Sequence, residues 1–266
     1  EVLYLVDSNE IVLMKDLKDK RARTPYLSPY HNYYMYFDAM KWKTTTDSIR
    51  FTAIIDKENQ ISAIESKDFF RKSRWNQFKG LLPVHPIGAI YRFEGLNPGL
   101  DITPEAILAE HNKMEYLDAF KQELDNLEGS GFVLYDRKNN VIHPLPKLYD
   151  WAKAARDRKD YDAIQILSQV NTGNNGILNL ADKTIDMEGV VPFSLSDSQL
   201  VRVFPIKKEV LIGENRNLLF GGKVEAGKID FIGSKEKQFQ FQYDNYKILC
   251  DSIDSLKFVL VREIGF

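Results

Sequence analysis

The residues with the clearest potential for recognition are aromatic and basic side chains that occur together in two segments. A basic run at 15–23 precedes a tyrosine-rich stretch at 26–36, and residues 69–75 combine two Phe residues with Arg, Lys and Trp. Aromatic rings offer flat apolar faces on which a sugar or a base can stack, and cationic side chains attract phosphate. The candidate binding residues are therefore Tyr30, Tyr33, Tyr34, Arg71, Arg74 and Trp75.

A glycan is the ligand class that this aromatic set favours, and single-stranded nucleic acid is a second interpretation of residues 15–36. The plainer alternative is a solvated turn followed by an aromatic strand, which Pro25 and Pro29 keep out of any helix. The 36 basic and 38 acidic residues give a net charge of −2. That balance provides no general attraction for nucleic acid or for an anionic membrane, so a nucleic-acid partner is not expected.

The histidines and the cysteine show no pattern that is typical of a metal site. None of the four histidines (His31, His85, His111 and His143) has a His or Cys three or four residues away. Cys250 is the single cysteine, which excludes an internal disulfide and a cysteine-based zinc site, and we expect it to be a small packed side chain. The sequence therefore predicts no metal site and no cofactor.

Two carboxylate pairs have a spacing that could serve acid–base chemistry or calcium binding. They are Asp160 with Asp162, and Asp251 with Asp254. Carboxylates next to β turns more often cap the turn, and we expect that role here. The glycine-rich stretch 171–176 lacks the lysine and the following helix of a phosphate-binding loop. No catalytic constellation is predicted, so the sequence favours a protein that is not an enzyme.

The length and the hydropathy of the chain bound its class and its location. A chain of 266 residues is long enough for one large all-β domain or two smaller ones. No stretch approaches 18 consecutive apolar residues, so no membrane-spanning segment is predicted. The sequence starts at Glu1 without a Met, which leads us to expect a fragment or a processed product whose targeting segment is missing.

Two distant segments share one pattern and predict a repeated unit. Residues 37–51 and residues 243–258 both read aromatic-Asp-x-apolar-Lys-apolar, then a short gap, then Asp-Ser-aliphatic-basic-Phe. A looser echo links 185–189 with 229–233. Because alternate residues of a strand face opposite sides, each unit reads as two short strands with one wet face, separated by an Asp-Ser turn. Such units bury their apolar face by stacking on neighbours.

A resemblance follows from the same residues. The tract from Asn217 to Phe258, with Phe220-Gly221-Gly222-Lys223-Val224-Glu225-Ala226-Gly227 near its start, resembles a recurrent segment in very long, uncharacterised proteins of the Bacteroidetes. Their shared motifs are "aromatic-Gly-x-Val-x-Ala-Gly", "Tyr-Asp-x-aromatic-Lys-Ile" and "Ile-Asp-Ser-aliphatic". The resemblance extends over residues 33–95 and 160–266. It implies a setting in the cell envelope or at the cell surface, and it implies no particular activity.

The middle of the chain changes character and predicts a helical insertion. Thr103 and Pro104 are typical of a helix start, and apolar residues at 117, 120, 124 and 127 predict one buried face of the next helix. A hairpin around 137–140 and a third helix over about 147–158 complete an order that resembles a winged helix. Residues 103–128 hold seven acids and two bases, a net charge of −5, which argues against a DNA-facing role and favours packing or docking of a partner.

The predicted fold is mainly β, with a β-solenoid or stacked β-sheet scaffold and a small winged-helix-like α/β insertion. The expected divisions are an N-terminal β region at 1–100, the insertion at 101–159 and a solenoid-like β region at 160–266. Short β runs recur about every ten residues after 160, and few of the turns between them are tight Asn-Gly or Asp-Gly pairs. That scarcity favours a wound solenoid over hairpins.

The function that these observations favour is a non-enzymatic structural or binding module of a bacterial cell-envelope protein. Its expected partners are other segments of the same long polypeptide or a protein partner, with a glycan as a further alternative. A carbohydrate-active enzyme on a β-helix is the second interpretation, and a nucleic-acid-binding winged-helix protein is the third. The expected location is the cell envelope or the extracellular space, with the cytoplasm as the alternative.

Overall fold

The chain folds into two compact units, each of which is described by itself. A computed structural model describes residues 2–16, 18, 24–53, 60–196 and 198–258. The protein is mainly β, as the sequence predicts. The β unit comprises Glu1–Lys15, Tyr26–Lys67 and Asp162–Phe266, and the helical unit comprises Asp16–Pro25 and Asp68–Tyr161. The helical unit is thus mainly an insertion into the β unit between Lys67 and Asp162.

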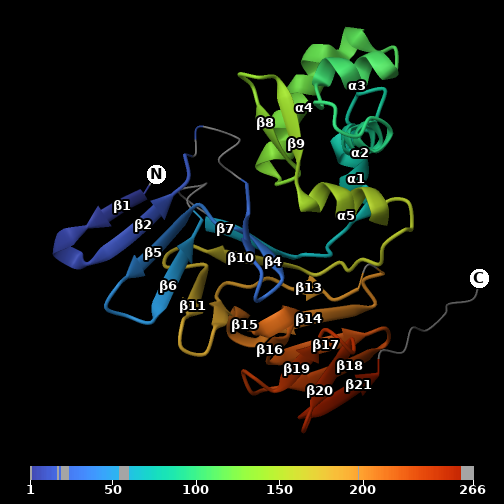
Figure 1. Cartoon of the computed structure of the whole chain (residues 1–266). Coiled ribbons are helices and arrows are strands. Elements are labelled where there is room, and N and C mark those ends of the chain that lie inside the picture. Colours follow the sequence, from blue (N-terminus) through green and yellow to red (C-terminus); the bar gives the residue numbers. More distant parts are fainter. Residues whose placement is uncertain (1, 17, 19–23, 54–59, 197, 259–266) are drawn as a thin grey trace, which may run out of the picture. The chain divides into compact units, whose positions relative to one another are not determined.

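A ten-stranded antiparallel sheet forms one layer of the β unit (Figure 1). In spatial order its strands are β1 (Val2–Leu5), β2 (Glu10–Met14), β5 (Ala39–Lys43), β6 (Ser48–Thr52), β11 (Gly176–Asn179), β12 (Thr184–Met187), β15 (Val210–Ile212), β16 (Leu218–Phe220), β19 (Phe239–Gln242) and β20 (Lys247–Cys250). The spatial order follows the sequence order, because the chain adds one hairpin after another along the sheet.

Two smaller sheets form the other layer. The four-stranded sheet runs β10 (Gln165–Val170), β7 (Gln60–Ser66), β4 (Tyr33–Tyr36), β3 (Tyr26–Ser28). The five-stranded sheet runs β13 (Phe193–Ser194), β14 (Val201–Pro205), β17 (Gly222–Ala226), β18 (Ile229–Gly233), β21 (Ser255–Phe258). An isolated antiparallel bridge between Ser168 and Val190 brings the two sheets edge to edge.

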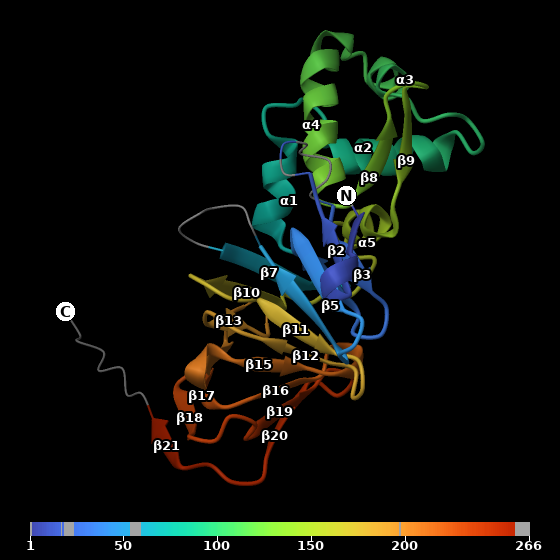
Figure 2. The same cartoon turned by 90° about the vertical axis from the view of Figure 1, so that its left-hand side faces the viewer.

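Successive hairpins alternate between the two layers. After β11 and β12 the chain makes β13 and β14 in the opposite layer, returns for β15 and β16, and crosses again for β17 and β18. The strand colours in Figure 2 therefore pass in sequence order from blue to red along the unit. Each hairpin leaves one apolar face toward the opposite layer, so the layers cover each other as stacked sheets do.

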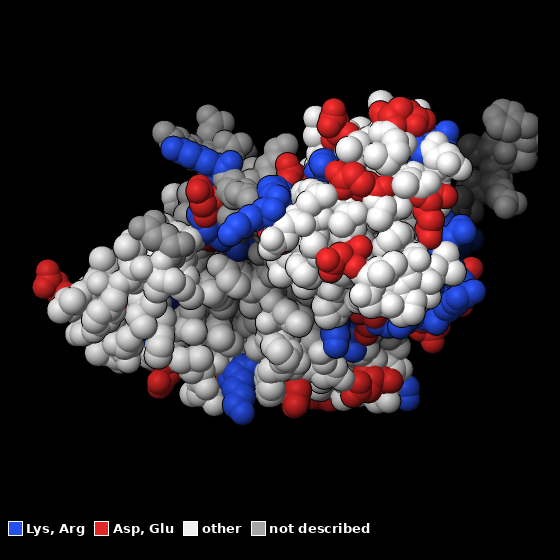
Figure 3. Space-filling model, turned by 45° about the horizontal axis from the view of Figure 1, so that its top comes forward, with Lys and Arg blue, Asp and Glu red and all other residues white. Residues whose placement is uncertain are grey.

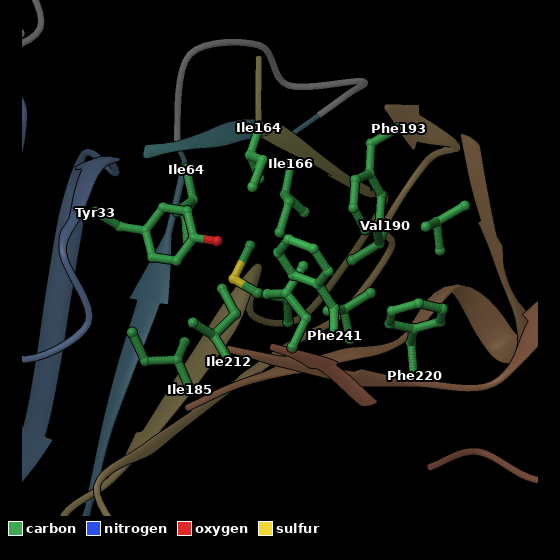
Figure 4. Packing of buried hydrophobic residues seen from close by; sticks show 14 of the residues in the cluster. Tyr33, Ile64, Ile164, Ile166, Ile185, Val190, Phe193, Ile212, Phe220 and Phe241 are labelled. Carbon is green, nitrogen blue, oxygen red and sulfur yellow. The ribbon is translucent and has the colours of Figure 1, made fainter. Parts of the chain in front are cut away.

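The core of the β unit lies between these layers (Figure 4). The ten-stranded sheet contributes Ile185, Ile212, Phe220 and Phe241, while the opposite layer contributes residues such as Tyr33 and Ile64. All of these side chains are almost fully buried. Burial of each large apolar side chain stabilises the fold by roughly 1.5–3 kcal/mol.

Neither a solenoid nor a closed barrel occurs in the described part of the chain, so the predicted winding is replaced by hairpins. Four of the hairpins share one kind of four-residue loop, those between Leu5 and Glu10, Asp136 and Val141, Asn179 and Thr184, and Gln242 and Lys247. In each loop the last residue has a left-handed backbone: Asn9, Asn140, Lys183 and Tyr246. Such loops reverse the chain without an Asn-Gly pair, so the scarcity of that pair was a misleading signal.

Glycines mark one crossing between the layers. Gly221 is the single residue between β16 and β17, and Gly222 has φ +110°, a conformation that side chains with a Cβ rarely adopt. A Cβ on Gly222 would lie 2.2 Å from the carbonyl oxygen of Phe204. The aromatic-Gly-Gly motif at 220–222 therefore encodes the change of layer.

The two segments with the shared sequence pattern occupy different positions. Residues 37–51 include β5 and β6, which pair with each other in the ten-stranded sheet. Residues 243–258 include β20 in the ten-stranded sheet and β21 in the five-stranded sheet. The link before β21 is tied to β18, because the backbone N–H of Asp254 donates to the carbonyl of Ile232 at 2.9 Å. One pattern therefore forms a hairpin in the first segment and a crossing in the second, which corrects the expected equivalence.

The helical unit contains more helix than the sequence predicts. Its elements are α1 (Lys72–Lys79), α2 (Pro86–Leu96), α3 (Pro104–Glu110), a 3₁₀ turn (Met114–Tyr116), α4 (Leu117–Gly129), the hairpin β8 (Val133–Asp136) and β9 (Val141–Pro144), and α5 (Pro146–Ala154). Residues 68–100, which we expected to belong to an N-terminal β region, hold α1 and α2. The boundary therefore lies at 68 instead of 101, because residues 68–161 share one core.

Local signals explain the helix starts in this unit. The Thr103 hydroxyl accepts a hydrogen bond from the N–H of Ala106 at 3.1 Å, and Pro104 occupies the first turn, as the sequence predicts. The His85 side chain likewise accepts a hydrogen bond from the N–H of Gly88 at the start of α2, and Pro86 occupies the first turn. The expected apolar face of α4 is buried through Phe120, Leu124 and Leu127. None of the described helices is both long and apolar enough to cross a membrane.

Candidate functional site

A buried polar cluster lies within the β unit and centres on Asp162. One of its carboxylate oxygens accepts hydrogen bonds from the Ser66 hydroxyl and from the N–H of Ile164, at 3.0 Å in the second case. The other accepts a hydrogen bond of 2.9 Å from the hydroxyl of Tyr243. A guanidinium nitrogen of Arg216 lies 3.8 Å from the same oxygen. The carboxylate is thus held by partners from four separate parts of the chain.

Burial dominates the electrostatics of this cluster. Removal from water raises the pKa of Asp162, and the hydrogen bonds from Ser66, Ile164 and Tyr243 together with the Arg216 charge act in the opposite direction. The Arg216 guanidinium also lies over the Tyr243 ring at 3.5 Å from the centroid. The cluster therefore joins the segments that carry its members.

The loop between β19 and β20 extends from this cluster. It contains Tyr243, bound to Asp162, and Tyr246, whose hydroxyl donates a 2.5 Å hydrogen bond to the carbonyl of Leu195 in the opposite layer. Burial, with the nearby Asp162 charge, raises the pKa of Tyr246 to about 12. Tyr246 is therefore a neutral side chain at ordinary pH, and its hydroxyl is held by the Leu195 carbonyl.

Beside Tyr246 a cavity of about 620 Å³ lies between the two layers of the β unit. Its walls are mainly apolar: Val201, Val224, Ala226 and Phe231 from the five-stranded sheet, and Phe239, Phe241 and Ile248 from the ten-stranded sheet. Pockets for small molecules in proteins usually measure about 300–1,000 Å³ and are lined mainly by such side chains. The size and the lining of this cavity therefore match a site for a small molecule.

A few polar groups line the same cavity. They belong to Tyr246, Ser196, Cys250, Asp251 and Ser252. The Cys250 thiol donates to the carbonyl of Ser252 at 2.7 Å, which engages it within its own turn. Asp251 is the one carboxylate among the described lining residues, and no Lys or Arg is among them. The site therefore suits an uncharged or cationic ligand better than an anionic one.

The tyrosines predicted to bind do not form one surface. Tyr33 and Tyr34 are buried in β4. The Tyr33 hydroxyl points into the core (Figure 4), and it lacks a hydrogen-bond partner in the described part of the protein. Tyr30 is exposed, packs edge-on against His31, and has the Lys183 ammonium 5.4 Å from its ring centre. Of the three, only Tyr30 offers its ring to solvent, so the predicted stacking platform is absent from this segment.

The other three predicted residues belong to the helical unit. The Trp75 ring stacks on His85 with the centroids 3.7 Å apart. The guanidinium groups of Arg71 and Arg74 lie over the Phe69 ring at 5.6 and 6.0 Å. These side chains stabilise the unit by packing against its own rings, so the aromatic-basic pattern marks internal cation–π contacts.

Some of the carboxylates and histidines singled out in the sequence have local partners. Asp254 accepts a hydrogen bond from the N–H of Ser234, and His31 lies between the Ser28 hydroxyl and the Lys183 carbonyl, at 2.7 and 2.8 Å. Within the described residues, no group of three His, Cys, Asp or Glu side chains has an arrangement that could hold a metal ion. The cavity is therefore the candidate site that the structure adds to the sequence analysis.

The cavity is not recognisable in the sequence, because its residues come from five strands. The one local signal was the alternation of Phe239 with Phe241 and of Ile248 with Cys250, which marks inward-facing positions without showing that space remains between them. Comparison of the chain with protein-family models, curated proteins and solved structures gave no match.

Proposed function

We propose that this chain is a non-enzymatic binding module of a bacterial cell-envelope protein, and that it holds a small, mainly apolar molecule between its two β layers. The observation that carries the proposal is the 620 Å³ cavity with apolar walls. The envelope setting rests on the resemblance of residues 217–258 to segments of long Bacteroidetes proteins. The ligand class rests on the lining alone: an uncharged or cationic molecule with one hydroxyl or amine near Tyr246 and Asp251.

The chemistry of the lining favours binding over turnover. Hydrolysis of a glycoside uses two carboxyl groups on opposite sides of the scissile bond. The described lining offers Asp251 as its single carboxylate, and the thiol of Cys250 is engaged with Ser252. A carbohydrate-active enzyme therefore has less support than a binding module. An apolar interior also suits a ligand with few hydroxyl groups better than a glycan.

We further propose that the helical unit is a winged-helix-like module that docks a protein partner. The order α3, α4, hairpin, α5 supports the comparison, with α1 and α2 as additions to it. Its acidic side chains are engaged with basic ones, as in the pairs Lys121–Glu105 and Arg137–Glu128. On the face shown in Figure 3, acidic and basic side chains are interspersed over this unit. This charge pattern supports a protein partner better than DNA.

Binding of a neutral fluorescent probe tests the cavity. Nile red is uncharged and brightens in apolar surroundings, so we expect saturable enhancement with wild-type protein. The A226W substitution places an indole inside the cavity and should weaken probe binding by at least about tenfold, equal to about 1.4 kcal/mol. The matched control is A181W, because Ala181 lies in an exposed turn of the same unit.

The binding of Nile red by the wild type, A226W and A181W distinguishes a site in the cavity from a site elsewhere. Weaker binding by A226W with unchanged binding by A181W supports the site. Equal binding by all three proteins, at equal thermal stability, would place the probe elsewhere and would remove the support for this function. Nile red competition by neutral and by anionic alkyl compounds of equal length then tests the charge preference.

A further inference from the structure

The two end strands of the ten-stranded sheet are β1 and β20. Among the described residues, β1 pairs with β2 alone and β20 with β19 alone. Each strand therefore has one edge whose backbone N–H and C=O groups are available to another strand. Natural proteins usually protect such edges with charged residues, Pro or a bulge.

The β1 edge lacks this protection. Val2–Leu5 is apolar throughout, and its side chains are 67, 38, 56 and 45% exposed. The strand carries no charge and no Pro. An exposed apolar strand with a free edge is a typical site for the addition of another strand.

An unbroken row of apolar side chains crosses the sheet and ends on these two strands. Cross-strand neighbours along the row are Tyr4, Ile11, Trp42, Ile49, Leu178, Ile185, Ile212, Leu218, Phe241 and Ile248. Most members lie in or against the core of the unit. Tyr4 and Ile248 end the row, each with a neighbour on one side only among the described residues. A further strand that continued the row would need an apolar side chain opposite Tyr4 or opposite Ile248.

The directions of the strands also allow the sheet to continue into a second copy. Every neighbouring pair in the sheet is antiparallel, and the sheet has ten strands, so β1 and β20 run in opposite directions. If a second copy is placed next to β20 in the same orientation as the first, its β1 is antiparallel to β20. The junction would then repeat the pairing found throughout the sheet.

We propose that a second copy of this chain adds its β1 to the β20 edge, so that copies associate head to tail through the ten-stranded sheet. In one register, Ile248 faces Tyr4 of the second copy and Cys250 faces its Val2, which continues the inward row. Leu249 then faces Leu3 on the outer side. Lys247 is the one charged residue of the two strands, so no like charges meet.

The two copies contribute different surfaces to this interface, because the β20 edge of one copy meets the β1 edge of the next. A heterologous contact of this kind leaves a free edge at each end of a dimer and allows further copies to add. Association should therefore produce a series of sizes and should depend weakly on salt, since apolar contacts and backbone hydrogen bonds form it. The inference does not depend on a ligand in the cavity.

The single native cysteine provides a sharp test of the register. The V2C substitution places a second thiol opposite Cys250 of the neighbouring copy, so oxidation with copper–phenanthroline should give a ladder of disulfide-linked dimers, trimers and larger species on non-reducing gels. L3C is the matched control, because residue 3 faces the other side of the strand. It should form the ladder at least about tenfold more slowly.

Sedimentation velocity of the full chain tests the association itself. The mean mass of the wild type should rise between about 10 μM and 1 mM, and V2K should remain monomeric because a lysine would lie in the apolar row. L100K carries the same change at an exposed apolar residue of the helical unit and should behave as the wild type. A monomeric wild type at 1 mM, or equal ladders from V2C and L3C, would overturn the proposal.

Discussion

The hydroxyl of Tyr243 donates a 2.9 Å hydrogen bond to Asp162, although 81 residues separate the two in sequence. Ser66, which lies 96 residues before Asp162, donates to the other oxygen of the same carboxylate. These bonds join the end of β7, the segment before β10 and the loop after β19. A single buried carboxylate thus connects early, middle and late parts of the β unit, and it does so next to the point where the helical insertion begins and ends.

Removal of the Asp162 carboxylate should destabilise the β unit strongly. The D162A variant removes the charge that faces the largely buried Arg216, and it removes the acceptor of the hydrogen bonds from Ser66 and Tyr243. Breaking a buried charge pair in this way costs about 3–5 kcal/mol. Urea denaturation should show this loss. D162N keeps an acceptor oxygen and should cost less, and a D162A variant within about 0.5 kcal/mol of the wild type would show that the cluster is dispensable.

The stability of the β unit should fall as the pH falls below about 6.5. Burial lowers the pKa of His31, although its hydrogen bond to the Lys183 carbonyl acts in the opposite direction. A lowered pKa means that the unfolded chain binds the proton first, so the neutral histidine stabilises the fold above the unfolded value of about 6.5. That contribution is lost as the pH falls from 6.5 through the folded pKa.

The H31Q variant isolates this effect. The difference in free energy of unfolding between wild type and H31Q should be largest at pH 7.5 and should shrink at pH 5, because glutamine does not titrate. Other titrating groups act alike in both proteins and cancel in the difference. A difference that stays constant with pH would mean that His31 does not change its protonation preference on folding.

The β class of the fold was predictable because short alternating apolar runs such as 239–241 are typical of a half-buried strand. The position of each strand in one layer or the other was not predictable. The segments 37–51 and 243–258 have similar sequences. In the first, the turn joins two strands that pair with each other, β5 and β6. In the second, the link before β21 donates a backbone hydrogen bond to Ile232 of β18. Layer choice therefore depends on long-range hydrogen bonds that a local pattern does not contain.

The candidate site was less predictable than the fold. Ring chemistry makes Tyr33, Tyr34 and Trp75 candidates, but composition does not show whether a ring is exposed, and all three rings pack inside the protein. The cavity depends on the space left between β14, β17, β18, β19 and β20, which is a property of packing and not of any motif. Helix α2 differs from these cases, since Pro86 in its first turn is a helix-start signal that is recognisable in the sequence.

Substitution of Gly222 should disrupt the crossing from β16 to β17. Its φ of +110° strains any residue with a Cβ, and the added atom of G222A would meet the backbone of Phe204 and Ile206 at 2.2 and 2.6 Å. We expect a loss of at least about 2 kcal/mol in the free energy of unfolding. G227A is the control, since its φ is +62° but no atom lies within 4 Å of its added Cβ. A loss in G222A no larger than in G227A would show that the close backbone approach is unimportant.

The β unit should fold without the inserted residues 68–161. The strands on either side of the insertion, β7 and β10, pair along six residues, from Gln60 with Val170 to Glu65 with Gln165. Ser66 and Asp162 are hydrogen-bonded at the end of this pair, so a short Gly-containing turn can replace the insertion and convert β7 and β10 into an ordinary hairpin.

The shortened chain should lose most of its helical circular dichroism, because α1 to α5 lie in the insertion. It should still unfold in one cooperative transition and bind Nile red as the full chain does. A shortened protein that is soluble but lacks a cooperative transition would show that the β layers need the insertion to fold.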